Sequence, residues 1–508
     1  MTTGLYSNVA DEWHQTAHGR KRRTRNVPDF TFLAVLLLRV TIPLSVVFAQ
    51  DPVKPHLKNC VADVFVPAEY ANTSYTGYLA ERMQINFNKR LLTLDLDKLL
   101  SGYEQRPGVQ FFCGEHIGKF LDAAVFAWRF TGNDALKQRV DDAVKRLIAT
   151  QLPDGYLGTY LDEDRWTNWD VWSHKYNLIG LEFYYQATGY QPALDACKEM
   201  ADLLCETFGN GNRDIISSGF HMGMASTSVL EPMARLYRLT GDKRYLDFCH
   251  YIIQAWEQPN GPRTLTTLLD SGNVSEVGNG KGYEMLSTLV GLMEMYRLEG
   301  DKRYLQACKN AWSDIVKHRL YPMGTTNVYH GHFLGERELP KDGGPDAATS
   351  EGCDTVTWLQ LNMHLLQVTG DPQYASQLEK TVYNALIGAQ SPHTGMVCMW
   401  IMEEGKRLFG DVSDDFVPDI FCCSSSLQRA VAWIPEFVSG AVNGAPTLYQ
   451  YVAGTHLIHA QVGNKAIPIQ LRVDTDYPRS GTITIHVDPS EAMQFPLLLR
   501  IPTWADAF

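Results

Sequence analysis

The chain has 508 residues, of which 45% are hydrophobic and 11% aromatic, so it can bury a large core. Its formal net charge is −12, from 45 lysines and arginines against 57 aspartates and glutamates, and no basic stripe runs through its body. Because binding to a nucleic-acid backbone needs concentrated positive charge, this composition argues against a nucleic-acid partner and suits a neutral substrate.

The first 49 residues have the pattern of an export signal. A basic cluster is followed by an apolar run over 30–49, and the run ends with small residues where signal peptidase cleaves. The run is also long enough to span a bilayer, so an uncleaved membrane anchor is the alternative. Arg39 in the middle of the run favours cleavage. We therefore expect residues 1–49 to be a signal peptide, and the mature protein to be secreted or periplasmic.

A repeated helical pattern follows. Five amphipathic segments each end on a glycine and continue into a second helical segment, and the glycines are Gly132, Gly189, Gly241, Gly300 and Gly370. Glycine supplies the left-handed conformation that ends a helix, and an Asp or Asn after it favours the turn into the next helix. The sequence therefore predicts five helical hairpins, with a sixth around 421–438.

Six such hairpins bury every apolar stripe if they close into a ring. We therefore predict a mainly α fold, with an (α/α)6 toroid over residues 50–445. An open superhelix is the alternative, but the long irregular links between the hairpins favour the ring. After residue 445, short runs with β propensity alternate with turn residues, which predicts a β-sandwich domain over 446–508. The chain stops soon after one of these runs, so we expect this domain to be truncated.

The clearest chemical motif combines cysteines with a glutamate. Cys422 and Cys423 are adjacent, and Glu351 and Cys353 lie two residues apart, which on an extended segment points them to the same side. Three thiolates and one carboxylate form a sensible tetrahedral set for Zn²⁺. The alternative is that the adjacent cysteines are small core residues and the glutamate lies on the surface. A closed four-ligand site would also ordinarily be structural rather than catalytic.

These motifs resemble a known family. The Glu-x-Cys and Cys-Cys pairs occur with four further segments, namely Gln151-Leu-Pro-Asp-Gly-Tyr-Leu-Gly-Thr-Tyr160, His174-Lys175, Gly335-Glu336 and Arg500-Ile-Pro-Thr-Trp504. From about Phe65 to its end, the chain resembles glycoside hydrolase family 127, the beta-L-arabinofuranosidase family. The resemblance implies an (α/α)6 toroid followed by β-sandwich domains, zinc bound by one Glu and three Cys, and retention of anomeric configuration.

The resemblance also implies roles for individual residues. Cys422 would be the nucleophile and a zinc ligand, and the other zinc ligands would be Glu351, Cys353 and Cys423. Glu336 would be the general acid/base, with the neighbouring Glu338 as a competitor for that role.

The resemblance further implies a sugar-binding role for His174. Trp400 is the ring in its segment that could stack on a sugar. Where the family offers further sugar-binding histidines, this sequence has Ser226 and Tyr283, which puts the substrate in doubt more than the chemistry. Aromatic residues around His174, such as Trp169 and Trp172, also suit a sugar site, although tryptophans are common core residues as well.

The expected function is that of a secreted retaining glycoside hydrolase. It would release beta-L-arabinofuranose or a similar sugar from oligo- or polysaccharides of plant type, with Zn²⁺ as cofactor and Cys422 as nucleophile. Two alternatives remain open. One is an inverting toroid glycosidase that uses two carboxylates and a structural zinc, and the other is a non-catalytic carbohydrate-binding protein with a decayed site.

Overall fold

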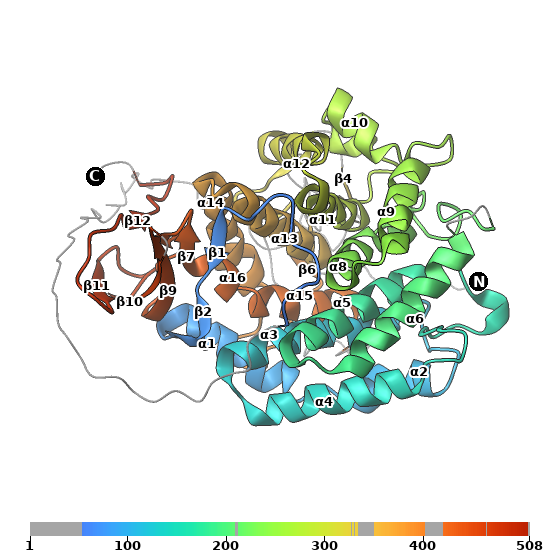
Figure 1. Ribbon diagram of the computed structural model, residues 1–508, viewed down its shortest axis with the longest axis horizontal. Coiled ribbons are helices and arrows are strands. Elements are labelled where there is room, and N and C mark those ends of the chain that lie inside the picture. Colours follow the sequence, from blue (N-terminus) through green and yellow to red (C-terminus); the bar gives the residue numbers. More distant parts are fainter. Residues whose placement is uncertain are drawn as a thin grey trace, which may run out of the picture.

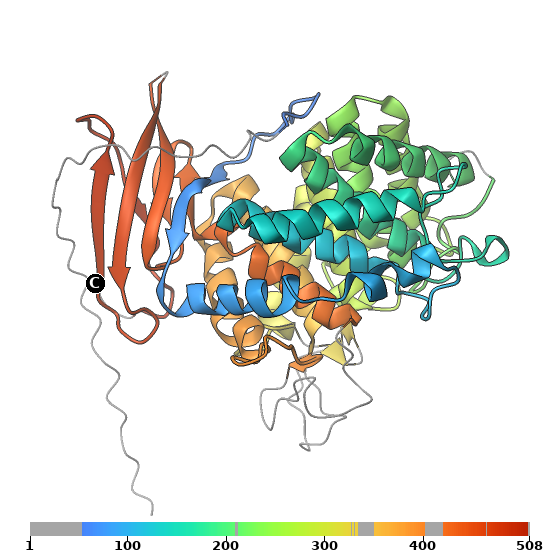
Figure 2. The ribbon, with the colours of Figure 1, turned by 90° about the horizontal axis from the view of Figure 1, so that it is seen from below.

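The computed structural model describes residues 53–208, 212–326, 328–329, 331–333, 350–401, 420–463 and 465–505. A helical part and a smaller strand part lie next to each other along the longest axis of the molecule (Figures 1 and 2). The expected signal peptide and the candidate acids Glu336 and Glu338 lie outside the described residues. Among the helices of the described ranges, none has the length and apolar character needed to cross a membrane.

The five predicted hairpins are confirmed. They are α3 (Glu115–Thr131) with α4 (Asp134–Ala149), α5 (Asp170–Thr188) with α6 (Gln191–Phe208), α8 (Leu230–Thr240) with α9 (Lys243–Trp256), α11 (Gly282–Glu299) with α12 (Lys302–Asp314), and α13 (Gly352–Thr369) with α14 (Pro372–Lys380). Each of the five glycines is left-handed, with φ between 65° and 75°. In four hairpins the Asp or Asn after the glycine caps the second helix with its side chain.

The first helices of the hairpins form a closed ring. Helix α3 packs against α5, and the contacts continue from α5 to α8, α11, α13 and α15 (Cys422–Ala432), which packs back onto α3. These inner helices are buried on most sides; in α13, for example, only two of the 18 residues are not buried. The outer helix α4 instead buries a single stripe, which consists of Leu136, Val140, Ala143, Val144 and Leu147. The inner helices thus form the core of the ring.

The sixth hairpin differs from the prediction. Helix α15 is followed only by the short α16 (Pro435–Val438), because strand β7 begins at Ser439 and takes the chain out of the ring. Helix α15 packs instead against α1 (Gly77–Asn86), a helix from near the start of the described chain. A helix from the N-terminal part of the chain therefore packs on α15, where the prediction placed the second helix of a sixth hairpin. The remaining α-helices are α2 (Leu96–Glu104), α7 (Met224–Thr227) and α10 (Thr264–Asp270).

Residues 53–64 form an extended segment, here called the strap, that crosses the C-terminal ends of four inner helices. In each case a strap N–H donates to the carbonyl three residues before a hairpin glycine: Val53 to Gln186 (2.7 Å), Leu57 to Arg238 (2.9 Å), Val61 to Arg297 (3.0 Å) and Val64 to Gln367 (2.8 Å). The strap thus satisfies carbonyls that a helix end leaves free. A Cβ at Gly370 would lie 2.7 Å from the Val64 side chain, so glycine is needed there for close approach as well as for its φ.

The strand part consists of two four-stranded sheets that share a small core. One sheet has the order β1 (Phe65–Pro67), β7 (Ser439–Val442), β8 (Ala445–Leu448) and β12 (Leu498–Leu499). The other has the order β11 (Ile483–Pro489), β10 (Lys465–Thr475), β9 (Gly454–Val462) and β2 (Glu69–Tyr75). Strands near the end of the chain were predicted, but β1 and β2 were not. Figure 2 shows these N-terminal strands, in blue, joined to the C-terminal strands.

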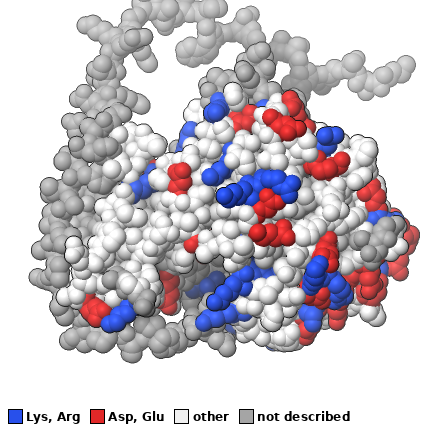
Figure 3. All heavy atoms as spheres, turned by 45° about the horizontal axis from the view of Figure 1, so that its top comes forward, with Lys and Arg blue, Asp and Glu red and all other residues white. Residues whose placement is uncertain are grey.

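On the face of the molecule shown in Figure 3, basic and acidic side chains are interspersed. No continuous basic surface appears there among the residues that the structure describes. This distribution agrees with the absence of a basic stripe in the sequence.

Candidate active site

The structure brings the four predicted metal ligands together. Glu351 ends the short strand β5 (Ser350–Glu351), Cys353 lies in the first turn of α13, and Cys422 and Cys423 open α15. Their ligand atoms all lie within 4.8 Å of one another. They meet because α13 and α15 are neighbours in the ring and begin at the same end of it. Helix N-termini carry partial positive charge, which favours the anionic form of these side chains.

The distances fit a tetrahedral zinc site. The Sγ atom of Cys423 lies 3.4 Å from that of Cys353 and 3.7 Å from that of Cys422. The Glu351 Oε1 atom lies 3.7 Å from the Cys423 sulfur and 4.0 Å from the Cys422 sulfur. Tetrahedral zinc with ordinary bond lengths would separate its ligand atoms by about 3.5–3.8 Å. The donors therefore suit Zn²⁺ in both number and spacing.

The three cysteines are not equivalent. Cys353 and Cys423 are buried, and burial raises the pKa of both thiols. Cys422 instead borders a pocket, and hydrogen bonds with the Cys353 and Cys423 thiols lower its pKa to about 6. The Ser426 hydroxyl lies 3.6 Å from the Cys353 sulfur. Among these cysteines, Cys422 is thus the one that a small molecule in the pocket can reach.

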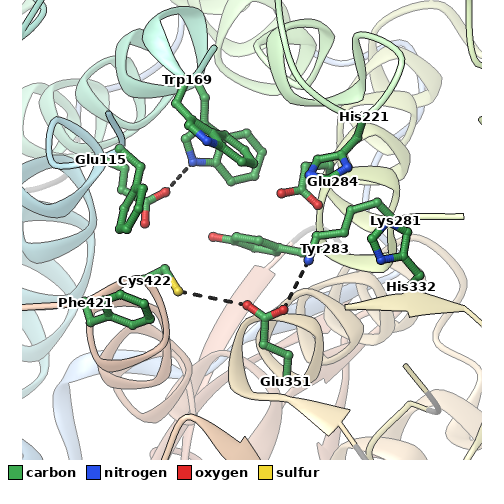
Figure 4. Close-up of a pocket in the computed structure, with 12 residues that line it drawn as sticks. Glu115, Trp169, His221, Lys281, Tyr283, Glu284, His332, Glu351, Phe421 and Cys422 are labelled. Carbon is green, nitrogen blue, oxygen red and sulfur yellow. Dashed lines mark hydrogen bonds and ion pairs between the residues drawn. The ribbon is translucent and has the colours of Figure 1, made fainter. Parts of the chain in front are cut away.

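The pocket has a volume of about 230 Å³ and lies where the inner helices begin (Figure 4). Glu115 opens α3, Trp169 precedes α5, and Glu284 lies in the first turn of α11. The pocket and the strap therefore lie at opposite ends of the ring, because the inner helices begin at one end and finish at the other. This volume is smaller than the 300–1,000 Å³ or so of pockets for drug-sized ligands, and it suits one sugar ring.

One wall of the pocket carries a buried ion pair. The Lys119 ammonium lies 2.7 Å from Glu115 Oε1, and the indole N–H of Trp172 donates a hydrogen bond to Glu115 Oε2. Burial alone would raise the pKa of Glu115, but Lys119 holds it below its usual value, so the carboxylate is ionised. Lys119 also donates to the backbone carbonyl of Cys422 at 3.4 Å. Lys119 therefore links the Glu115 carboxylate to the backbone of Cys422.

The opposite wall carries a second buried lysine. Lys281 Nζ lies 3.2 Å from Glu351 Oε2, so the lysine holds the carboxylate that would bind the metal. Gly331 crosses this ion pair so closely that a Cβ there would lie 1.9 Å from Lys281 Nζ. Glu284 borders the pocket on the same side, and its burial raises its pKa to about 7. Three carboxyl groups therefore line the pocket, and one of them is Glu351. Glu115 is held ionised, and Glu284, which faces it, takes up a proton near neutral pH.

His174, to which the resemblance assigns a sugar-binding role, lies away from the pocket. This histidine is fully buried, its ring contacts those of Tyr156 and Trp166 at centroid distances of 4.9 and 5.4 Å, and it is not among the residues that line the pocket. Residues three apart on a helix share a face, so Trp169 and Trp172 point into the pocket together. His174 lies two residues beyond Trp172 and faces away from it.

Trp400 was expected to stack on a sugar. It lies in β6 (Trp400–Ile401), which pairs with β5 so that its backbone lies opposite Glu351. It does not line the pocket. Its position is beside the strand that carries the predicted metal ligand Glu351. Of the two positions where the family offers histidines, Tyr283 lines the pocket, whereas the Ser226 hydroxyl donates to the backbone carbonyl of Ile215 at 2.6 Å.

Several pocket residues were missed by the sequence analysis: Glu115, His221, Lys281, Glu284 and His332. The sequence does contain an indication of the role of Glu115. Lys119 lies one helical turn further on, and both are charged residues in a helix that also carries many apolar ones. His221 and Lys281 lie in loops, Glu284 lies in the first turn of α11, and His332 lies in the two-residue strand β4 (His332–Phe333). At such positions no sequence period indicates the direction of a side chain.

Comparison with known proteins gives a consistent result. A sequence model of the beta-L-arabinofuranosidase catalytic domain of family GH127 matches residues 63–436, and one of the GH127 middle domain matches residues 447–508. A curated relative, the non-reducing end beta-L-arabinofuranosidase of Bifidobacterium longum subsp. longum, is 23% identical over 454 residues, which is 78% of this chain and 65% of the relative. The chain thus spans slightly less than two thirds of that relative.

Two solved structures resemble the chain over most of its length. One is a GH127 beta-L-arabinofuranosidase from Geobacillus stearothermophilus T6, with 20% identity and a TM-score of 0.68 over 85% of this chain and 75% of that one. The other is described as a GH127 beta-arabinofuranosidase, with 20% identity and a TM-score of 0.68 over 87% of this chain and 72% of that one. At this level of identity the similarity establishes the fold.

Proposed function

Because the chain belongs to glycoside hydrolase family 127, the beta-L-arabinofuranosidase family, we propose that it is a retaining glycoside hydrolase. Its substrate would be a terminal beta-L-arabinofuranose, or a similar sugar, on an oligo- or polysaccharide of plant type. The helical ring would be the family's (α/α)6 toroid, and the strand part would be a β-sandwich domain. We further propose that the protein is exported, on the basis of its N-terminal sequence.

One observation carries the proposal. A cysteine sulfur borders a sugar-sized pocket while it belongs to a cluster of three sulfurs and one carboxylate. Such a cluster fits zinc, and bound zinc would keep the cysteine sulfurs in the anionic, nucleophilic form. A purely structural zinc site would not require one of its ligands to face an open pocket.

In the first step, the Cys422 sulfur would attack the anomeric carbon. A C–S bond forms as the glycosidic C–O bond breaks, and the departing oxygen takes a proton from the general acid. In the second step, the general base takes a proton from water while the water oxygen attacks the same carbon, and the C–S electron pair returns to the sulfur. Two displacements on one carbon retain its configuration, as in retaining enzymes that use a carboxylate nucleophile.

We propose Glu336 as the acid and base of these steps. The described chain stops at Phe333, directly after His332 on the pocket wall, and resumes at Ser350, directly before Glu351. The pocket-lining residues His332 and Glu351 therefore flank the sequence that contains Glu336. Glu338 is the competing carboxylate in the same sequence, and replacing each glutamate in turn by Gln separates them.

The test is a panel of nitrophenyl glycosides that includes the beta-L-arabinofuranoside. We expect Cys422→Ser to lower turnover at least about a thousandfold, since nucleophile variants lose most of the rate enhancement. Cys60→Ser, which changes an exposed thiol remote from the pocket, is the matched control and should leave turnover unchanged. Elemental analysis should give one zinc per chain, lost on Cys353→Ala. Full turnover by Cys422→Ser would contradict the proposal.

A second candidate function is supported by Glu115 and Glu284, two of the three carboxyl groups that line the pocket. Their surroundings lower the pKa of Glu115 and raise that of Glu284 to about 7, which is a pattern found in acid and base pairs. An inverting enzyme would use such a pair and keep zinc for structure. Proton NMR of the first-formed sugar decides between the two, because inversion gives the opposite anomer, and Cys422→Ser would then remain active.

A further inference from the structure

A strained turn lies at the edge of the pocket. His221, Met222 and Gly223 are consecutive left-handed residues, with φ of 58°, 54° and 75°. For residues with a Cβ this conformation is costly, and glycine would adopt it at no steric cost. Strained backbone of this kind persists only where the surrounding structure imposes it, and it is concentrated at functional sites. The turn places the His221 side chain at the pocket, which suggests a functional role for this residue.

The turn is held by a neighbouring loop. The Phe220 N–H donates to the Asn168 carbonyl at 3.4 Å, and Asn168 is itself left-handed with φ of 52°. The Trp169 ring contacts those of Phe220 and His221, at centroid distances of 5.3 and 5.7 Å. Since Trp169 also lines the pocket, the two loops fix the position of His221 relative to the pocket wall.

Hydrogen bonds fix the tautomer of His221. The Asn279 Oδ1 atom accepts from the Lys281 N–H at 3.4 Å, so the amide nitrogen of Asn279 faces the histidine. This nitrogen donates to His221 Nδ1 at 3.1 Å, which makes Nδ1 the acceptor and leaves the ring proton on Nε2. Burial lowers the pKa of His221 to about 3, and Lys281 and His332 act in the same direction, so the ring is neutral.

His221 and Cys422 line the same pocket from opposite sides (Figure 4). The His332 ring lies edge-on to His221, with the centroids 5.6 Å apart and an interplanar angle of 71°. A neutral imidazole with a fixed N–H is a hydrogen-bond donor of defined direction, and it suits an uncharged hydroxyl oxygen.

We propose that His221 is a substrate-binding residue, whose Nε2–H donates to one ring hydroxyl of the sugar that Cys422 attacks. This inference rests on the proposed function and adds a specificity-determining residue to it. This role would explain why the strained position holds a histidine rather than a glycine, because a glycine there would have no side chain to contact the substrate. His221 is at neither of the two positions, Ser226 and Tyr283, where the family has further sugar-binding histidines.

The test compares His221→Gly with Met222→Gly. Both changes relieve left-handed strain in the same turn, so neither should lower the melting temperature. His221→Gly should lower kcat/KM for the parent nitrophenyl glycoside about tenfold or more, as expected for one lost hydrogen bond to substrate. Met222→Gly changes an exposed side chain and should keep kcat/KM within about twofold.

Monodeoxy analogues of the glycoside identify the bonded hydroxyl. For one analogue, wild type and His221→Gly should have equal kcat/KM, because the oxygen that His221 contacts is missing. Equal activity of both proteins on the parent glycoside would overturn the inference. A uniform loss on every analogue, together with a lower melting temperature, would also overturn it and indicate a structural role.

Calorimetric titration with the free sugar separates this inference from the proposed function. If wild type cleaves no glycoside yet binds the sugar, and His221→Gly does not bind it, the proposed function fails and His221 remains a sugar-binding residue. If wild type cleaves the glycoside and His221→Gly matches it in both assays, the inference alone fails.

Discussion

Lys281 and Glu351 form an ion pair, Nζ to Oε2 at 3.2 Å, that joins the pocket wall to the metal cluster. Both side chains are buried, and the other oxygen of Glu351 lies near the sulfurs of Cys422 and Cys423. A buried partner of this kind orients a ligand for the metal. The lysine thus acts on the cluster without contacting its sulfurs.

We expect Lys281→Met to weaken zinc binding by about 10- to 100-fold, the usual loss when such an orienting partner is removed. Competition with a fluorescent zinc chelator measures the change. Lys302→Met, at an exposed position on α12, is the control and should bind zinc as wild type does. Unchanged affinity in Lys281→Met would show that the ion pair does not position Glu351.

The Glu115–Lys119 pair should behave as one unit in stability measurements. Glu115→Gln leaves the fully buried Lys119 ammonium without its anion and should reduce the free energy of unfolding by roughly 3–5 kcal/mol. The double variant Glu115→Gln/Lys119→Met should lose less than the sum of the two single changes. Lys243→Met breaks an exposed ion pair and should change stability by less than about 1 kcal/mol. Additive losses would contradict the coupling.

Lys175 should make stability depend on pH. Burial lowers the pKa of this side chain to about 7 from an ordinary value of 10.5. Between pH 7 and 10.5 the unfolded chain therefore binds a proton at Lys175 that the folded chain does not. Burial of the charged lysine destabilises the folded state fully below pH 7, and this destabilisation decreases as the pH rises towards 10.5.

Lys175→Met removes this pH-dependent destabilisation of the folded state. We expect the variant to gain roughly 3–5 kcal/mol over wild type at pH 6.5 and clearly less at pH 9.5, measured by urea unfolding. An equal difference at both pH values would mean that Lys175 does not titrate in this range.

Ser426 should affect how strongly the Cys353 sulfur donates electrons to a bound metal. Its hydroxyl lies 3.6 Å from the Cys353 sulfur and 3.2 Å from the Tyr283 hydroxyl. Loss of a hydrogen bond to a ligand sulfur raises its electron donation, so Ser426→Ala should shift the sulfur-to-metal absorption of the cobalt-substituted protein to longer wavelength. Ser425→Ala is the matched control, because the Ser425 hydroxyl contacts His116 at 3.0 Å instead. Identical spectra for the Ser426 variant and wild type would contradict this role.

The sequence predicted the parts of the fold that depend on local chemistry. Hairpin glycines such as Gly241 and Gly300 are visible because a left-handed helix end has a local residue preference. Strands β1 and β2 were missed because they are short and pair with β7 and β9, more than 350 residues further along the chain.

The site was predicted in the same uneven way. The cluster could be predicted because thiols and a carboxylate at such spacings have few other uses. The motif that contains His174 does not specify which face of its helix meets the pocket, and the structure puts Trp169 and Trp172 there instead. His221 depends on a turn with three left-handed residues, and the preferences of its individual residues do not indicate such a turn.

The strap has a consequence for biosynthesis. Its last bond joins Val64 to Gln367, so a ribosome must add roughly 300 residues after the strap has been made before the strap can dock completely. At ordinary elongation rates this wait is about 15–60 s. The strap can therefore dock only stepwise, as α5, α8, α11 and α13 emerge in turn, and the end of α13 is the last of the four helix ends that it covers.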